Sequence, residues 1–177
     1  MGDSLITIVA IVLAAILMFV FPLMTMSDRS DDISQLTVET ATTEFVDNVR
    51  TTGRLSLADY SAYEQRISAT GNSYDIELEA QILDENPGKK TTQANSTKIG
   101  ENVYYSMYTS QILDTISSDT TSTLAFKEGD IFSASAKNKS TTLSQQFKNF
   151  FYSVTGNDIY TIAAEHAGYV TANGSGN

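Results

Sequence analysis

A long apolar run without a single charged residue stands out near the start of the chain. Leu5 to Met26 reads LITIVAIVLAAILMFVFPLMTM, and as a helix this run would be roughly 33 Å long. The hydrocarbon core of a bilayer is about 30 Å thick, so such a helix can cross it. We predict a transmembrane anchor over residues 1–26, with a kink at Pro22 because proline removes one backbone hydrogen bond of the helix.

A cleaved secretory signal is the alternative interpretation of this run. Three features favour a retained anchor: no basic residue precedes the run, it is longer than the apolar part of a usual signal, and no A-x-A site follows it. The membrane orientation has two interpretations. Arg29 directly after the run points to a cytoplasmic C-terminal part, whereas the acidic, cysteine-free and threonine-rich remainder favours the outside, which we predict.

The helical pattern continues beyond the anchor. Its apolar stripe, with spacings of mostly three and four residues, consists of Ile33, Leu36, Val38, Ala41, Phe45 and Val49. Gly53 is the expected end of the helix, since glycine adopts the left-handed conformation that closes many helices. We predict one helix from about residue 5 to 52, whose membrane-proximal amphipathic part, residues 27–53, packs its stripe against the rest of the domain.

Residues 54–170 alternate between helix and strand patterns. Ser56 begins a second amphipathic helix that ends before Gly71. From Tyr74 to Ile82, apolar and polar residues alternate strictly, which is typical of a half-buried strand. A turn at residues 86–89 and a polar loop at 91–100 follow. The segment from Val103 to Ile116 is ambiguous, and we predict a short helix from about Ser110 to Ser117.

The C-terminal third predicts a hairpin, a helix and a strand. Leu124 and Phe126 precede the turn at residues 128–130, and alternation resumes from Phe132 to Ala136. Apolar residues from Leu143 to Val154 predict an amphipathic helix that stops at Gly156, followed by a strand at about 159–170 and a flexible tail at 171–177. The fold class is therefore α+β: a long N-terminal transmembrane and amphipathic helix, then a small antiparallel sheet of about four strands covered on one face by helices.

Composition and charge narrow the possible functions. The formal net charge of −10 repels nucleic acids and anionic lipid headgroups, whose binding needs Lys and Arg. The absence of cysteine excludes disulfides, thiol chemistry and a zinc–thiolate site. The nucleotide-binding and nucleophile-elbow glycine motifs do not occur. We therefore expect no enzyme activity, no cofactor, no nucleic-acid partner and no small-molecule substrate.

A few residues could still contribute chemistry. His166 is the only histidine, and we expect it to be structural, although composition leaves a Ser-His-Asp arrangement open. The acidic pairs are Asp31 with Asp32 and Glu77 with Glu79. We interpret both pairs as solvated surfaces; a Ca²⁺ site is the alternative, but no calcium-loop motif is present.

Three clustered tyrosines, Tyr104, Tyr105 and Tyr108, have no regular spacing. A contact surface is one interpretation, because tyrosine combines a large apolar ring with a hydrogen-bonding hydroxyl. A place in the core is the interpretation that we prefer.

The chain resembles the type IV pilin class in its uninterrupted apolar N-terminal helix, its internal Pro22 and its amphipathic continuation into a small α+β head. More narrowly, it resembles pilin-like and pseudopilin proteins of Gram-positive bacteria that are related to the tight-adherence (Tad, TadE-like) minor pilins. The runs that carry this likeness are EFVDNVRTTGRLSLADYSAYEQRISATGNSYDIELEAQ, from Glu44 to Gln81, and KEGDIFSASAKN, from Lys127 to Asn138.

The resemblance implies a structural subunit of a cell-surface filament or of a secretion or conjugation machine. Such subunits assemble through their N-terminal helices and display their heads outward. The implied assembly positions are Asp3, Ile6, Val9, Leu13, Ile16, Val20 and Pro22. Asp3 is either a solvated residue or a carboxylate that pairs with the N-terminal amine of a neighbouring subunit. The partners are then membrane lipid and other copies or related pilin-like subunits; a membrane-tethered adhesin or sensor that does not polymerise is the alternative.

Overall fold

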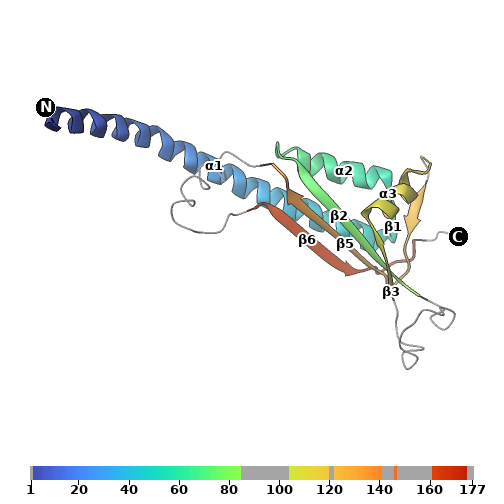
Figure 1. The fold of residues 1–177 in the computed structure, drawn as a ribbon. Coiled ribbons are helices and arrows are strands. Elements are labelled where there is room, and N and C mark those ends of the chain that lie inside the picture. The colour runs from blue at the N-terminus through green and yellow to red at the C-terminus, as the bar shows by residue number, and fades with distance from the viewer. Residues whose placement is uncertain (1, 85–103, 120–121, 141–145, 147–160, 175–177) are drawn as a thin grey trace, which may run out of the picture.

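The structure is a computed structural model that describes residues 2–84, 104–119, 122–140, 146 and 161–174. Its elements (Figure 1) are α1 (Gly2–Thr52), β1 (Arg54–Ser56), α2 (Leu57–Ser68), β2 (Tyr74–Leu83), β3 (Tyr104–Tyr108), α3 (Thr109–Ser117), β4 (Thr123–Ala125), β5 (Ile131–Asn138) and β6 (Ala163–Tyr169). The predicted turn and loop at 86–100 lie outside the described residues, and so does the predicted helix at 143–154 apart from Gln146, which is helical.

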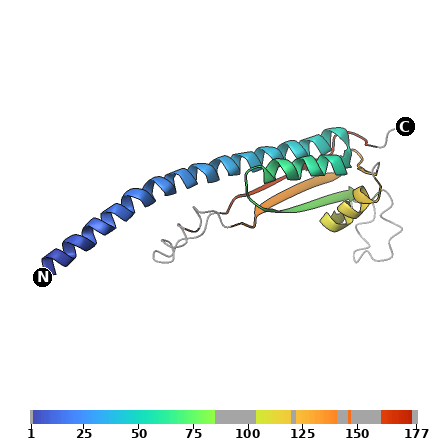
Figure 2. The same ribbon diagram turned by 90° about the horizontal axis from the view of Figure 1, so that it is seen from above.

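The predicted long N-terminal helix is confirmed. α1 has 51 residues and is therefore about 77 Å long. Its N-terminal half projects beyond the head, and it curves gently along its length (Figure 2). The helix continues through Pro22. Gly53 ends it with a φ of 66°, and the N–H of Gly53 donates to the carbonyl oxygen of Val49 at 2.8 Å.

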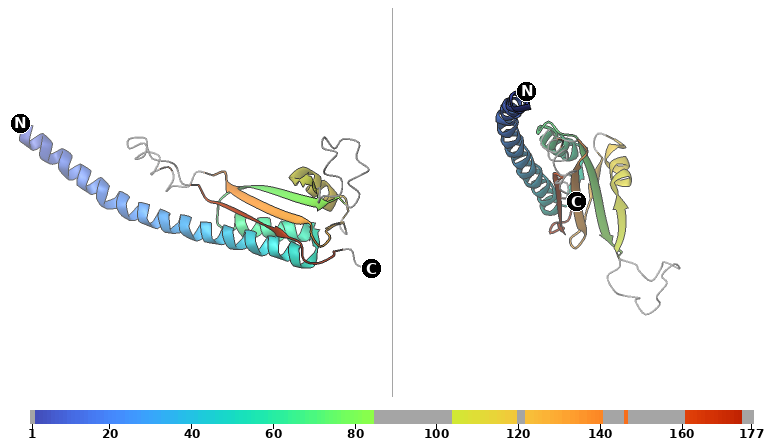
Figure 3. Two further views of the ribbon diagram at one scale, coloured as in Figure 1. Left: turned by 90° about the horizontal axis from the view of Figure 1, so that it is seen from below. Right: turned by 60° about the vertical axis from the view of Figure 1, so that its left-hand side comes forward.

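The main sheet has four antiparallel strands in the order β3-β2-β5-β6. α1 and α2 lie along one face of this sheet (Figure 3), and the helices and the sheet share one core. The α+β architecture predicted from the sequence is confirmed. The N-terminus of α2 is also as expected, because Ser56 caps it in a reciprocal capping box with Asp59.

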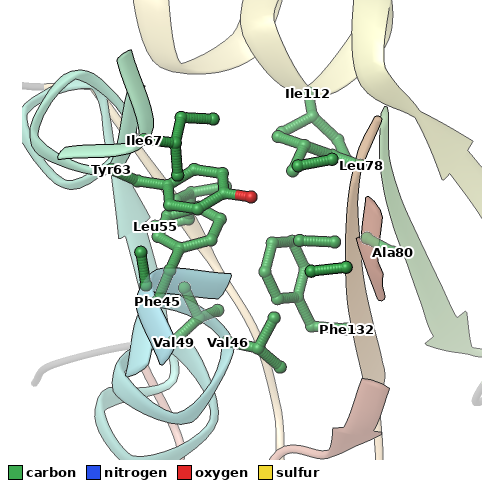
Figure 4. Packing of buried hydrophobic residues seen from close by; sticks show 14 of the residues in the cluster. Phe45, Val46, Val49, Leu55, Tyr63, Ile67, Leu78, Ala80, Ile112 and Phe132 are labelled. Carbon is green, nitrogen blue, oxygen red and sulfur yellow. The ribbon is translucent and has the colours of Figure 1, made fainter. Parts of the chain in front are cut away.

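The core lies between the C-terminal half of α1 and the sheet (Figure 4). The ring of Phe45 on α1 stacks on that of Tyr63 on α2, with centroids 4.5 Å apart. Phe132 of β5 meets Phe45 edge-on at 5.8 Å. The α1 segment from Val38 onwards is therefore an integral part of the head, and its burial stabilises the outer half of a helix whose many threonines lower its helix propensity.

Two parts of the sequence prediction for the sheet are wrong. The predicted hairpin does not form, because β4 pairs with β1 in a separate two-stranded sheet rather than with β5. Strand β3 was not predicted at all, although the helix after it was. Between β4 and β5, the buried carboxylate of Asp130 accepts hydrogen bonds from the N–H groups of Leu83 and Lys127. These bonds stabilise a tight turn after which the chain enters the other sheet.

The start of the predicted flexible tail is fixed to the head. The N–H of Thr171 donates to the carbonyl oxygen of Arg50 at 2.9 Å, and that of Gly174 donates to Phe126 at 2.8 Å. Gly174 is buried beside Gly53. Residues 171–174 therefore join the end of α1 to the β4–β5 turn.

Candidate assembly surface

The apolar half of α1 projects from the head, and no other described part of the chain covers it. The helix is long and apolar enough to cross a membrane, and none of its most apolar stretch is buried within the molecule. Among the predicted assembly positions, Ile6 is 66% exposed and Val9 and Leu13 are each 57% exposed. Ile16 and Pro22 are also exposed, and Val20 is partly exposed. The side chain of Asp3 lies outside the described residues.

The predicted positions from Ile6 to Val20 lie on one side of α1, because their spacings of three and four follow the helical period. Pro22, two residues after Val20, lies on the opposite side. The rest of the apolar half is equally exposed and equally apolar. Its other large exposed side chains are Leu5, Ile8, Ile11, Val12, Leu17, Met18, Phe19, Phe21, Leu23 and Met26. A helix that is hydrophobic all round needs an apolar environment on every side, supplied by lipid or by other helices.

The apolar stripe of α1 is rotated relative to the prediction near the head. Ile33 is 66% and Leu36 is 64% exposed, so both point away from the core that they were predicted to join. Asp31 and Ser34 take the buried positions instead, at 5% and 4% exposure. Beyond the uncharged run, α1 therefore carries two further exposed apolar side chains, Ile33 and Leu36.

His166 lies on β6 beside α1. Its Nε2 atom lies 3.5 Å from Oδ1 of Asp47, and Nη1 of Arg50 donates to the same oxygen at 2.7 Å. Nε of Arg50 donates at 2.9 Å to the carbonyl oxygen of Tyr169, near the end of β6. This small polar cluster holds α1 against the edge strand.

The prediction that the two acidic pairs are solvated surfaces is correct for Asp32 and Glu77, which are exposed, but not for their partners. Asp31 is buried, and only Asp32 of that pair is exposed. Glu79 is half-buried, and its Oε1 accepts hydrogen bonds from Ser106 at 2.8 Å and Gln81 at 3.2 Å. Among the described residues, no three His, Asp or Glu side chains are placed to hold a metal ion together.

A groove opens on the face of the sheet that α1 does not cover. Its volume is about 540 Å³. Its lining consists of Glu77, Leu78, Glu79, Tyr108, Thr109, Ser110, Ser133, Ala134, Ser135 and Glu165. Three of these side chains are carboxylates and none is basic, so the groove has a negative potential that favours cations over anions.

The tyrosine cluster is a surface rather than part of the core. Tyr105 is 44% and Tyr108 is 60% exposed, so the preferred prediction is wrong for both. Tyr104 is partly buried, and its hydroxyl donates to the carbonyl oxygen of Gly129 at 3.2 Å. The edge position of β3 explains this exposure. The sequence signal for β3 was the run of aromatic residues in YYSMY, since aromatic residues favour strand over helix.

No protein-family model matches the chain, and searches of curated proteins and of solved structures likewise find no match.

Proposed function

We propose that the protein is a pilin-like structural subunit, without enzymatic activity, that assembles through the projecting half of α1. Its head is displayed outside the cytoplasm. In this proposal the apolar half lies in the membrane before assembly and packs against the α1 helices of other subunits afterwards.

One observation supports the proposal above all others: a single continuous helix is buried in the head at one end and bare and apolar at the other. Val38 and Val46 are fully buried, whereas Ile6 and Leu13 are more than half exposed. Because the helix does not break between them, the head is rigidly joined to the apolar half. A flexible tether would suffice for simple anchoring, whereas a rigid rod transmits a defined orientation from one subunit to the next.

The absence of native cysteine makes disulfide crosslinking a direct test. The single variants Val9→Cys and Ile16→Cys of the full chain are expressed in the native host, and its membranes are then oxidised. We expect crosslinked dimers or crosslinks to another small membrane protein. Asp114→Cys, on the exposed surface of α3, is the matched control and should remain monomeric. Monomers at every position scanned along residues 5–26 would contradict assembly through α1.

The second candidate is a membrane-tethered binding domain that does not polymerise, and the acidic groove on the open sheet face favours it. The two candidates differ in what they require of residues 1–26. Replacing these residues with an unrelated transmembrane helix keeps a tether but removes the assembly surface. Surface display with lost assembly supports the pilin-like subunit; function retained in full supports the tethered domain.

A further inference from the structure

Strand β2 is paired with β3 along only half of its length. It has 10 residues and pairs with β5 from Tyr74 to Gln81. On its other side it pairs with β3 only from Glu79 to Leu83. Within the described part of the chain, the first half of β2 therefore has an open edge next to β3. α3 lies towards the opposite end of β2 (Figures 1 and 3).

Two hydrogen bonds show which backbone groups of β2 point to the open edge. The N–H of Leu78 donates to Oγ1 of Thr109 at 2.8 Å, on the β3 side of the strand. The carbonyl oxygen of Ser73 instead accepts from Lys139, on the β5 side, at 2.8 Å. In an antiparallel strand, successive residues point their N–H and C=O groups alternately to the two sides of the strand. The N–H and C=O groups of Tyr74 and Ile76 therefore point to the same side as those of Leu78, which is the open edge. In the described structure these groups have no other strand to pair with.

The side chains along the open edge differ between the two faces. On the core face, Tyr74 and Ile76 are only partly buried. On the other face, Glu77 and Glu79 line the acidic groove of about 540 Å³. An added strand would place alternate side chains on these two faces.

We propose that this open edge binds an extended segment of a partner protein in which apolar and basic residues alternate. The backbone of the segment pairs with Tyr74 and Ile76, as in recognition by strand addition. Its apolar side chains cover Tyr74 and Ile76, and its Lys or Arg side chains face Glu77 and the groove. A second copy of this chain is disfavoured there, since each copy has a net charge of −10. This inference does not depend on assembly through α1.

The test uses the full chain in nonionic detergent micelles and the capped peptide Lys-Val-Lys-Val-Lys-Val-Lys. We expect the amide of Ile76 to exchange about tenfold more slowly with saturating peptide, since strand pairing protects the N–H that points to the open edge. The amide of Glu77 points to β5 and should change little, so it is the internal control. The same peptide with Glu in place of Lys should not bind.

Charge variants separate this site from nonspecific attraction to an acidic protein. Glu77→Lys should weaken binding of the lysine peptide by about tenfold, because it replaces an attractive contact with a repulsive one. Glu128→Lys changes the net charge equally at an exposed turn and should weaken binding less than threefold. Equal effects of the two variants, binding without protection of Ile76, or no binding at millimolar peptide would each overturn the proposal.

Discussion

The side-chain amide of Gln35 pairs with both backbone groups of Ala163. Nε2 of Gln35 donates to the carbonyl oxygen of Ala163 at 2.7 Å, and Oε1 accepts from its N–H at 3.1 Å. Gln35 on α1 thereby occupies the place of a neighbouring strand at the start of β6. Arg50 bonds to Tyr169 at the other end of the strand. Because open edge strands tend to pair with other chains, α1 both supports the sheet and closes this edge.

Gln35→Ala should expose the amide of Ala163 without unfolding the head. We expect the hydrogen exchange of this amide to accelerate by about fivefold, since an exposed hydrogen bond contributes about 1 kcal/mol. Gln35→Glu keeps an acceptor for the N–H but loses the donor to the carbonyl oxygen, so it should retain most of the protection. The measurement is residue-resolved amide exchange. If the amide of Ala163 exchanged at the same rate in the two variants, the pairing between Gln35 and Ala163 would not hold β6.

Asp130→Ala should be strongly destabilising. The carboxylate is buried at 2% exposure, and its two oxygens accept from Leu83 at 2.9 Å and Lys127 at 2.8 Å. Removing it leaves two backbone N–H groups unpaired, at a cost of about 2–4 kcal/mol. Urea unfolding of the full chain measures the loss. Asp114→Ala, at an exposed position on α3, is the control and should change stability by less than about 0.5 kcal/mol.

Gly53→Ala and Gly71→Ala form a matched pair. Both glycines have a positive φ, 66° and 82°, so alanine costs about 1–2 kcal/mol at either position. Only at Gly53 would the new methyl group also meet backbone, because it would lie 2.5 Å from the nitrogen of Gly174 and against the carbonyl oxygen of Ala172. At Gly71 the space is open.

We therefore expect Gly53→Ala to displace residues 172–174 and to lower the thermal midpoint clearly more than Gly71→Ala. Similar losses in the two variants would mean that the C-terminal segment yields easily. The close packing between the end of α1 and residues 172–174 would then contribute little to stability.

The elements predicted correctly are those that local periodicity determines. α1, α2, β2 and β5 each have a regular apolar pattern and a clear end signal such as Ser56 or Gly53. The pairing of β1 with β4 could not be predicted in the same way. Each strand has three residues, and their contact depends on the N–H of Phe126 reaching the carbonyl oxygen of Gly53, far away in the sequence.

The prediction of the apolar stripe near the head was wrong for a different reason. Polar residues take buried positions on α1 because the helix itself satisfies their hydroxyls. Ser34 donates to the carbonyl oxygen of Ser30 at 2.8 Å, and Thr42 donates to that of Val38 at 2.7 Å. A pattern that treats every polar residue as exposed therefore rotates the stripe towards Ile33 and Leu36. The groove was missed because it combines residues of four separate segments.

Tyr63→Phe should affect stability in a pH-dependent way. Tyr63 is 3% exposed, and its hydroxyl lies 2.9 Å from Oγ1 of Thr42. Because the hydrogen of Thr42 already goes to Val38, Tyr63 is the donor. Losing this bond should cost about 1 kcal/mol at neutral pH. Burial is the main reason that the pKa of Tyr63 is raised above the ordinary 10.0.

The raised pKa determines the sign of the effect at high pH. The folded state favours the neutral phenol, so the stabilisation by Tyr63 is complete below about pH 10 and is lost as the pH rises through the folded-state pKa. The difference in stability between the wild type and Tyr63→Phe should therefore shrink above about pH 10. Tyr60→Phe is the control: the pKa of Tyr60 is also raised, mainly by burial, but its loss should change stability little at neutral pH. A difference that stays constant up to strongly alkaline pH would show that the Tyr63 phenol can ionise without leaving its buried place.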